Sequence, residues 1–178
     1  ARSSEPAKLV EVMGNVEYPG VYPLTSDMTV KSLIDASFDF KEYTDKEYAL
    51  LKRVNLDKNK VEFEAISLGD PSSLTRKLKE LDKLYVFSLN MPREETIADL
   101  IEEIKKQTSK QNEQSLVTIN GQVRFPGTYP LSKNMTAYDL VAAAGGYTES
   151  SYLVDFNVAR FVTNGVNESE YDLQTIEL

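Results

Sequence analysis

Aromatic residues that recur beside two proline-containing turns are the first candidates for binding chemistry. They are Tyr18 and Tyr22 in one stretch of the chain, and Phe125 and Tyr129 in another. Because an aromatic face suits the apolar face of a sugar ring, these side chains could stack on a carbohydrate. The alternative, that they pack each hairpin against its own domain, is favoured, since a duplicated domain repeats its packing requirements.

Two arginines, Arg53 and Arg160, recur near equivalent predicted strands. They could bind an anionic sugar or pair across a subunit interface. A solvated strand face or a local ion pair is the favoured interpretation, because exposed ion pairs are common and contribute little. The candidate ligand-binding residues are therefore Tyr18, Tyr22, Arg53, Phe125, Tyr129 and Arg160.

Residue types that support catalysis are scarce. The chain has no Cys and no His, which excludes a disulfide, a thiolate nucleophile, a His general base and a Cys/His zinc site. Glycosidases use two carboxylates about 5 to 10 Å apart. With 28 acidic residues some pair will meet that distance, yet no Asp or Glu has a distinctive sequence context. We expect no catalytic residue, no metal site, no cofactor and no enzyme activity.

Composition narrows the class of protein further. The 178 residues are 41% hydrophobic and 27% charged, as in soluble globular domains. No apolar run is long enough to cross a bilayer of roughly 30 Å as a helix. The formal net charge of −8 repels phosphate backbones, so we expect no nucleic-acid partner.

A repeat organises the chain. GNVEYPGVYPL at residues 14–24 returns as GQVRFPGTYPL at residues 121–131, and about a dozen identities extend from Val10/Val117 to Ala36/Ala143 without a gap. Alternating apolar residues before each glycine predict a half-buried strand. The Pro-Gly pair that follows predicts a type II turn. The repeat therefore predicts two copies of one domain, each beginning with a hairpin.

A short helix is expected after each hairpin. Thr29 and Thr136 are good N-cap residues, and apolar residues follow at helical spacing. Gly145-Gly146 predicts a sharp end for the second helix, whereas the first copy has Phe38-Asp39 there. The helix exit of the first copy is therefore expected to differ from that of the second.

Further strands are predicted downstream of each helix. Their ranges are 48–54, 64–68 and 81–87 in the first copy, and 152–161 and 174–178 in the second. An amphipathic helix is predicted over 94–110 between the copies. The second copy has no counterpart of the strand at 81–87, so we expect its last strand to come from outside this sequence or from another part of the chain.

These motifs carry a family resemblance. The pattern G-x-V-x-[YF]-P-G-x-Y-P-L, then M-T-x-x-x-L-[IV]-x-A and, in the second copy, AGGYTESSY and Ala159-Arg160, resembles the SLBB (soluble-ligand-binding β-grasp) domain. The first copy lacks the AGG and has Lys52-Arg53 at the later strand. Tandem SLBB domains joined by an acidic amphipathic helix most resemble polysaccharide-export outer-membrane proteins.

The resemblance implies an α+β fold with two β-grasp-like SLBB domains in tandem. The expected boundaries are 7–90 for the first domain, 91–114 for the connecting helix and linker, and 115–178 for a second domain truncated at its end. It also implies a periplasmic location, with attachment to the outer membrane through other parts of the protein.

The implied function is a non-catalytic role in capsule or exopolysaccharide export, in assembly of the channel wall and passage of polysaccharide. The implied partners are polysaccharide, other copies of the full-length protein and an inner-membrane polysaccharide co-polymerase. A soluble module that binds a small ligand or a glycan is the alternative. A polysaccharide-acting enzyme would need a carboxylate pair in a cleft.

Overall fold

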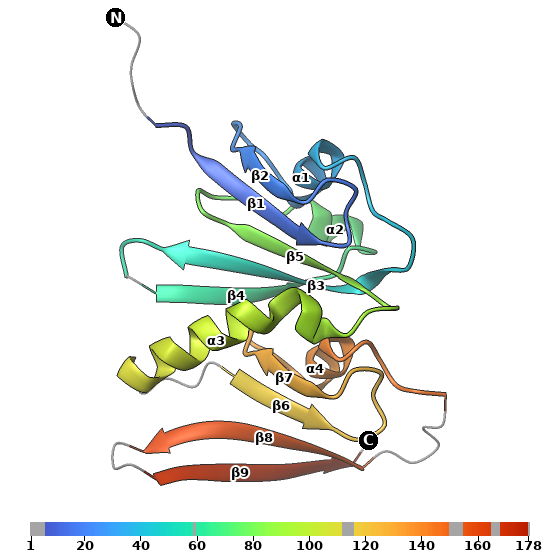
Figure 1. The fold of residues 1–178 in the computed structure, drawn as a ribbon, viewed down its shortest axis with the longest axis vertical. Helices are drawn as coiled ribbons and strands as arrows, with labels where there is room; N and C mark the ends of the chain where they lie inside the picture. The colour runs from blue at the N-terminus through green and yellow to red at the C-terminus, as the bar shows by residue number, and fades with distance from the viewer. Residues whose placement is uncertain (1–5, 59, 112–115, 150–154, 165–167, 178) are drawn as a thin grey trace, which may run out of the picture. The chain divides into compact units, whose positions relative to one another are not determined.

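The computed structural model describes residues 6–58, 60–111, 116–149, 155–164 and 168–177, and places side chains for residues 6–58, 60–107 and 116–149. The chain divides into two compact units, Ala1–Met91 and Pro92–Leu178, and each is described by itself (Figure 1). Both combine helices with a sheet, and the sheet of the first unit is mixed, as the α+β prediction requires.

The first unit is a five-stranded sheet with two short helices. Its elements are β1 (Leu9–Gly14), β2 (Gly20–Pro23), α1 (Val30–Ala36), β3 (Thr44–Asn55), β4 (Lys60–Ile66), α2 (Pro71–Leu74) and β5 (Lys83–Ser88). The strand order is β2-β1-β5-β3-β4. Strands β1 and β5 run parallel, and the other neighbours are antiparallel. The hairpin strand β2 is therefore at one edge.

The core of the first unit lies between this sheet and α1. Alternate residues of β1, Val10 and Val12, are buried, as the period of a strand with one covered face requires. Leu33 and Ile34 of α1 are buried in the same cluster. Each fully buried aliphatic side chain of this kind stabilises the fold by roughly 1.5–3 kcal/mol. The inner face of the hairpin strand β1 is thus part of this core.

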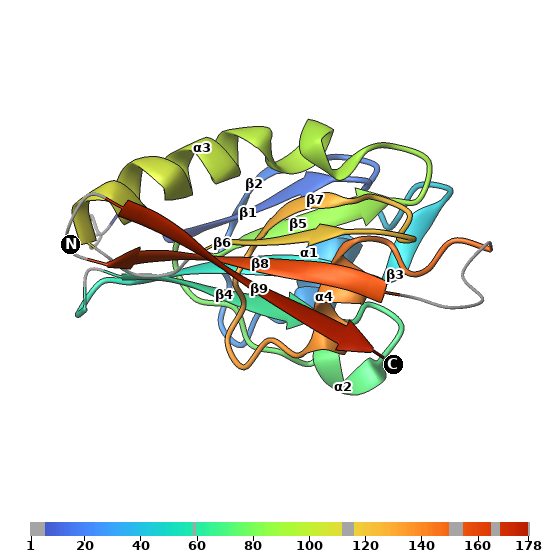
Figure 2. The same ribbon diagram turned by 90° about the horizontal axis from the view of Figure 1, so that it is seen from below.

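The second unit begins with a long helix. Its elements are α3 (Arg93–Gln111), β6 (Leu116–Asn120), β7 (Gly127–Pro130), α4 (Ala137–Ala143), β8 (Asp155–Asn164) and β9 (Glu168–Glu177). The strand order is β7-β6-β8-β9, with antiparallel neighbours throughout. Strands β8 and β9 form a long twisted ribbon (Figure 2). The helix predicted between the copies belongs to this unit.

The sheets of the two units differ at one place. In the first unit β5 lies between β1 and β3, whereas in the second unit β6 pairs directly with β8. Among the strands that the structure describes there is no counterpart of β5 in the second unit, as the sequence predicts. In the described sheet of the second unit, β6 and β8 are therefore direct neighbours.

Both predicted helix starts are confirmed. Thr29 caps α1 and Thr136 caps α4, and each forms a reciprocal capping box with the third helical residue, Ser32 or Asp139. The Thr side chain accepts a hydrogen bond from the backbone N–H of that residue at 3.2 Å in both copies. These bonds satisfy helix N–H groups that have no partner within the helix.

The predicted type II turns are wrong. Gly20 and Gly127 have φ of 155° and 156° and are the first residues of β2 and β7, whereas the second central residue of a type II turn needs φ near +80°. The turn begins earlier, at Gly14 and Gly121, where φ is 91° and 116°. The connection between the two hairpin strands therefore has a glycine with positive φ near each end in both copies.

The prediction that the two helix exits differ is wrong, because both have the same left-handed backbone despite their different sequences. Gly145 and Gly146 have φ of 81° and 84°, and Phe38 and Asp39, at the same positions of the first copy, have φ of 62° and 76°. A bulky residue in this left-handed region is rare because its Cβ approaches the backbone. The first copy therefore accepts strain that the second copy avoids with glycine.

No helix within the described residues is long and apolar enough to cross a membrane.

Candidate functional site

The tyrosine that ends each repeated turn holds the turn closed. The Tyr22 hydroxyl donates a hydrogen bond to the Tyr18 carbonyl at 2.6 Å, and the Tyr129 hydroxyl donates to the Phe125 carbonyl at 2.5 Å. Tyr129 is 2% exposed, and this burial raises the pKa of its hydroxyl. Both hydroxyl groups thus donate their hydrogen bond to the backbone of the turn and not to a ligand.

Arg53 is engaged inside the first unit. Its Nε and Nη2 donate to the Asp82 carboxylate at 2.9 and 2.6 Å, and Nη2 also donates to the Lys77 carbonyl at 2.9 Å. The Asp82 side chain is almost fully buried, and its hydrogen bond raises the pKa of the Arg53 guanidinium. The pair fixes β3 to the loop before β5.

Tyr18 lies open to solvent, with 61% of its surface exposed. Its ring meets the ring of Phe38 edge to face, with centroids 5.2 Å apart and planes at 79°. Phe38 is itself 71% exposed. The turn of the first copy therefore presents a pair of aromatic side chains.

Phe125, the counterpart of Tyr18, is half-buried. Its ring lies so close to Gly145 that an added Cβ there would be 2.7 Å from Phe125 Cδ2. The guanidinium carbon of Arg93 lies 5.0 Å from the centroid of the Phe125 ring. Arg93 Nε also donates to the Ala143 carbonyl, at the end of α4, at 3.0 Å. One arginine thus fastens α3 to both the turn and the helix of this copy.

Arg160 lies on β8, where its backbone is opposite Val117 of β6 and Asp172 of β9. Its side chain lies outside the residues whose side chains the structure describes.

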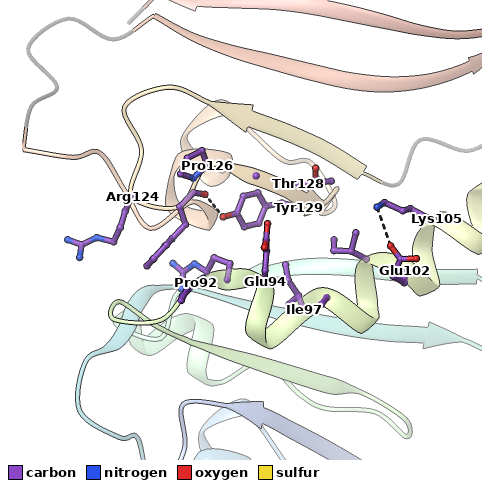
Figure 3. A pocket seen from close by; sticks show the side chains of 14 residues that line it. Pro92, Glu94, Ile97, Glu102, Lys105, Arg124, Pro126, Thr128 and Tyr129 are labelled. Atoms are coloured by element: carbon purple, nitrogen blue, oxygen red, sulfur yellow. Dashed lines mark hydrogen bonds and ion pairs between the residues drawn. The ribbon is translucent and has the colours of Figure 1, made fainter.

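A groove in the second unit is the most developed candidate site. Its volume is about 530 Å³, and it runs between the first turns of α3 and the hairpin (Figure 3). The hairpin contributes the stretch from Arg124 to Tyr129, which includes two predicted candidates. The helix contributes Ile97, Ala98 and Ile101 as an apolar wall. The volume of the groove is within the range of small-ligand sites, but polar and apolar groups contribute about equally to its lining, whereas most such sites are mainly apolar.

Charged side chains surround the groove without converging on one point. Lys105 forms an ion pair with Glu102 at 3.2 Å. Glu94 extends from α3 towards Tyr129, whereas Arg124 extends away from it (Figure 3). Such a rim could orient hydroxyl groups or a short peptide. Within the described residues no three acidic side chains gather to hold a metal ion.

The sequence analysis missed the helix side of this groove. The spacing of Ile97, Leu100 and Ile101 predicts an amphipathic helix, but the pattern does not say which hairpin that helix covers. Arg93, at the start of α3 and only 3% exposed, was not a candidate. The one available signal was a charged residue at the start of a predicted helix, which is usually solvated.

Comparison with known families supports the domain assignment. Residues 9–37 and 116–170 match the family model of the SLBB domain. The first segment covers the hairpin and α1, and the second runs from β6 into β9. An SLBB domain suggests a ligand-binding module, as found in polysaccharide-export proteins. No curated protein sequence matches the chain.

Proposed function

We propose, from the SLBB match, that this chain is a non-catalytic periplasmic module of a capsule or exopolysaccharide export protein. It would contribute to the wall of an export channel and to passage of the polysaccharide. The observation that carries this proposal is the match of residues 9–37 and 116–170 to the SLBB domain. The repeated unit supports it, since Tyr22 and Tyr129 each donate a hydrogen bond to a carbonyl four residues earlier. A rigid unit built twice along a chain is suited to a wall.

The proposed partners follow from this role. The full-length protein would self-associate, meet polysaccharide inside the channel and contact an inner-membrane co-polymerase. Attachment to the outer membrane would come from parts of the protein outside this sequence.

The proposal is tested in the cell that makes the protein. Deletion of the coding sequence for residues 7–178 should abolish polysaccharide at the cell surface and leave it in the periplasm. A Tyr138→Ala variant, which changes a 73% exposed tyrosine on α4, is the matched control and should export normally. Normal surface polysaccharide after the deletion would exclude the export role.

A glycan-binding module is the second candidate, and the groove under α3 favours it. Phe125 and Tyr129 lie in its lining beside the apolar wall. The probe is a set of oligosaccharides cut from the producing cell's own polysaccharide, titrated into the isotope-labelled chain. Saturable chemical-shift changes at Thr128 and Tyr129 would support binding in the groove.

A variant that fills the groove makes this test specific. Ala98 lines the groove and is exposed, so Ala98→Trp should block sugar binding without disturbing the core. Asp99→Trp, at an exposed neighbouring position that does not line the groove, is the matched control. If neither the wild-type chain nor Asp99→Trp shows chemical-shift changes at millimolar sugar, the glycan-binding candidate is wrong and the channel-wall proposal remains.

A further inference from the structure

The two hairpins differ in what lies on them. In the second unit residues of α3 line the groove together with Thr128 and Tyr129, and Tyr129 and Pro130 are buried. In the first unit the equivalent Tyr22 is only half-buried and Pro23 is exposed. One copy of the hairpin is thus covered by a helix, and the other is open.

The open copy presents apolar side chains to solvent. We call Glu17, Tyr18, Val21 and Phe38 the first hairpin face; Tyr22, the neighbour of Val21 on β2, packs against the core instead. Tyr18, Val21 and Phe38 are 61%, 58% and 71% exposed, and Val21 stands where the covered copy has a threonine. An apolar patch of neighbouring side chains on a soluble domain is typical of an interaction surface.

Backbone strain marks the same surface. Phe38 keeps φ at 62° although the second copy has glycine at that position. Strain of this kind persists where the surrounding structure imposes it and is frequent at functional sites. The strained residue holds its ring against Tyr18, with centroids 5.2 Å apart. The aromatic pair is therefore formed before any partner binds.

The charge of the first hairpin face is opposite to that of the covered copy. Glu17 replaces Arg124, and both side chains are exposed. Asp35 and Asp39 are also exposed at the end of α1, although Asp35 forms an ion pair with Lys31 at 2.8 Å and Lys31 and Lys46 both interact with the charge of Asp39. The C-terminus of a helix adds partial negative charge. A cation is therefore the complementary group.

The covered copy shows where such a cation would bind. Arg93 lies over the Phe125 ring and donates to the Ala143 carbonyl. The counterparts of these two groups in the first unit are the Tyr18 ring and the carbonyl of Ala36, the last residue of α1. Ala36 is half-buried, whereas Ala143 is fully buried. Both groups are therefore present on the open copy, although the Phe38 Cβ stands where the Phe125 ring lies over Gly145, so the Tyr18 ring cannot lie as Phe125 does.

We propose that the first hairpin face binds an amphipathic helix of another polypeptide. This helix begins with an arginine and carries apolar residues four and eight positions later, the spacing of Arg93, Ile97 and Ile101 in α3. Its arginine stacks on Tyr18 and donates to the Ala36 carbonyl, and its flanking residues are basic because they face Glu17. This inference does not depend on the proposed role in polysaccharide export.

Two synthetic peptides test the proposal on the whole 178-residue chain. The first has the sequence of residues 92–106, and the second has the same sequence with Glu94→Lys, Glu95→Lys, Glu102→Lys and Glu103→Lys. Saturable chemical-shift changes are expected at the amides of Tyr18, Val21 and Phe38, with tighter binding of the basic peptide. Arg93→Ala in the basic peptide should weaken binding about tenfold, since the arginine makes both anchoring contacts.

Variants of the protein separate this surface from others. Tyr18→Ala should weaken binding of the basic peptide about tenfold through loss of the stacking surface. Tyr138→Ala removes a more exposed tyrosine, from α4, and should leave peptide binding unchanged. Glu17→Arg should reverse the preference, so that the acidic peptide binds more tightly.

Several outcomes would overturn the proposal. They include no shifts at millimolar peptide, shifts confined to the hairpin of Phe125 and Tyr129, and binding that survives Tyr18→Ala. Concentration-dependent shifts at Tyr18 and Phe38 without peptide would make a second copy the occupant. Shifts at these amides with oligosaccharide, when neither peptide binds, would make the surface a sugar site.

Discussion

The two copies of the hairpin and helix reach the same backbone with different side chains on it. In the first copy Phe38 occupies a left-handed position and Tyr18 is exposed beside it. In the second copy Gly145 occupies that position, and Phe125 lies over it beneath Arg93. The repeated residues thus give both copies a similar backbone. Residues outside the repeat determine whether the aromatic side chain before the Pro-Gly pair is exposed to solvent.

The second lesson concerns how each unit is held together. The first unit has a central β5 and a buried ion pair between Arg53 and Asp82. The described part of the second unit has no strand equivalent to β5, and Arg93 joins α3 to the hairpin and α4 there. A variant that removes one of these interactions should therefore destabilise one unit and leave the stability of the other unchanged.

Arg53→Ala is expected to have the largest effect. It leaves the Asp82 carboxylate, which is 1% exposed, without its cationic partner. Breaking a buried pair in this way costs about 3 kcal/mol of unfolding free energy. Hydrogen exchange should show the loss at the amides of β3 and β5 and leave those of β6 and β7 unchanged.

The control for Arg53→Ala is Lys77→Ala, which breaks the exposed contact of Lys77 with Asp27 and should change the exchange rates little. Equal destabilisation of both units by Arg53→Ala would show that they unfold together. The comparison of two separately held units would then be wrong.

Gly145→Ala should have the next largest effect. The added Cβ meets Phe125 Cδ2 at 2.7 Å and adopts φ near 81°, so strain and ring displacement together cost about 2 kcal/mol. Gly146→Ala is the matched control, because φ is 84° there but no atom lies within 4 Å of the new Cβ. Denaturant unfolding should rank Gly145→Ala as the more destabilising change, and equal costs would mean that Phe125 does not pack on Gly145.

Tyr129→Phe should cost about 1 kcal/mol, through loss of the hydrogen bond to the Phe125 carbonyl. Tyr22→Phe removes the same bond from a half-buried site, so its cost should be smaller. If both variants lose the same unfolding free energy, the burial of Tyr129 beside α3 does not strengthen its hydrogen bond.

The same variant tests a pH dependence. Burial raises the pKa of Tyr129 above its unfolded value, which is near 10. Since the unfolded chain then loses this proton first, the stabilisation is complete below about pH 10 and is lost as pH rises towards the folded pKa. Unfolding free energies measured from pH 8 to 11 should fall less steeply in Tyr129→Phe than in the wild-type protein.

Much of each repeat was predictable because its signals are local. Capping by Thr29 and Thr136 depends on residues within one turn, and the strand of Val10 and Val12 depends on alternation. The turn type was mispredicted because the Pro-Gly pair dominated the pattern. Gly20 does have a positive φ, of 155°, but not the value near 80° that a type II turn needs, and Gly14 has φ of 91°. Local rules give element types more reliably than the residue at which the chain turns.

The candidate site was less predictable because its two sides are distant in sequence. Phe125 and Tyr129 stood out through the repeat, but Arg93 lies outside it and contacts Ala143, 50 residues away. Sequence alone also could not separate Tyr18 from Phe125, since both precede Pro-Gly. Within the second unit Arg93 of α3 lies over the Phe125 ring, and such a contact between distant residues is a tertiary property.

Phe38→Gly should have the smallest effect and gives the sharpest test of the comparison. Glycine relieves the strain at φ of 62°, worth about 1 kcal/mol, but removes the edge contact with Tyr18, worth about 0.5–1 kcal/mol at an exposed site. Tyr43→Gly is the matched control, because Tyr43 is 63% exposed with φ of 59°. Tyr43→Gly should stabilise the first unit more than Phe38→Gly does, because no ring pair is lost. Equal stabilisation would show that the aromatic pair contributes nothing and that Phe38 is held in place by its backbone alone.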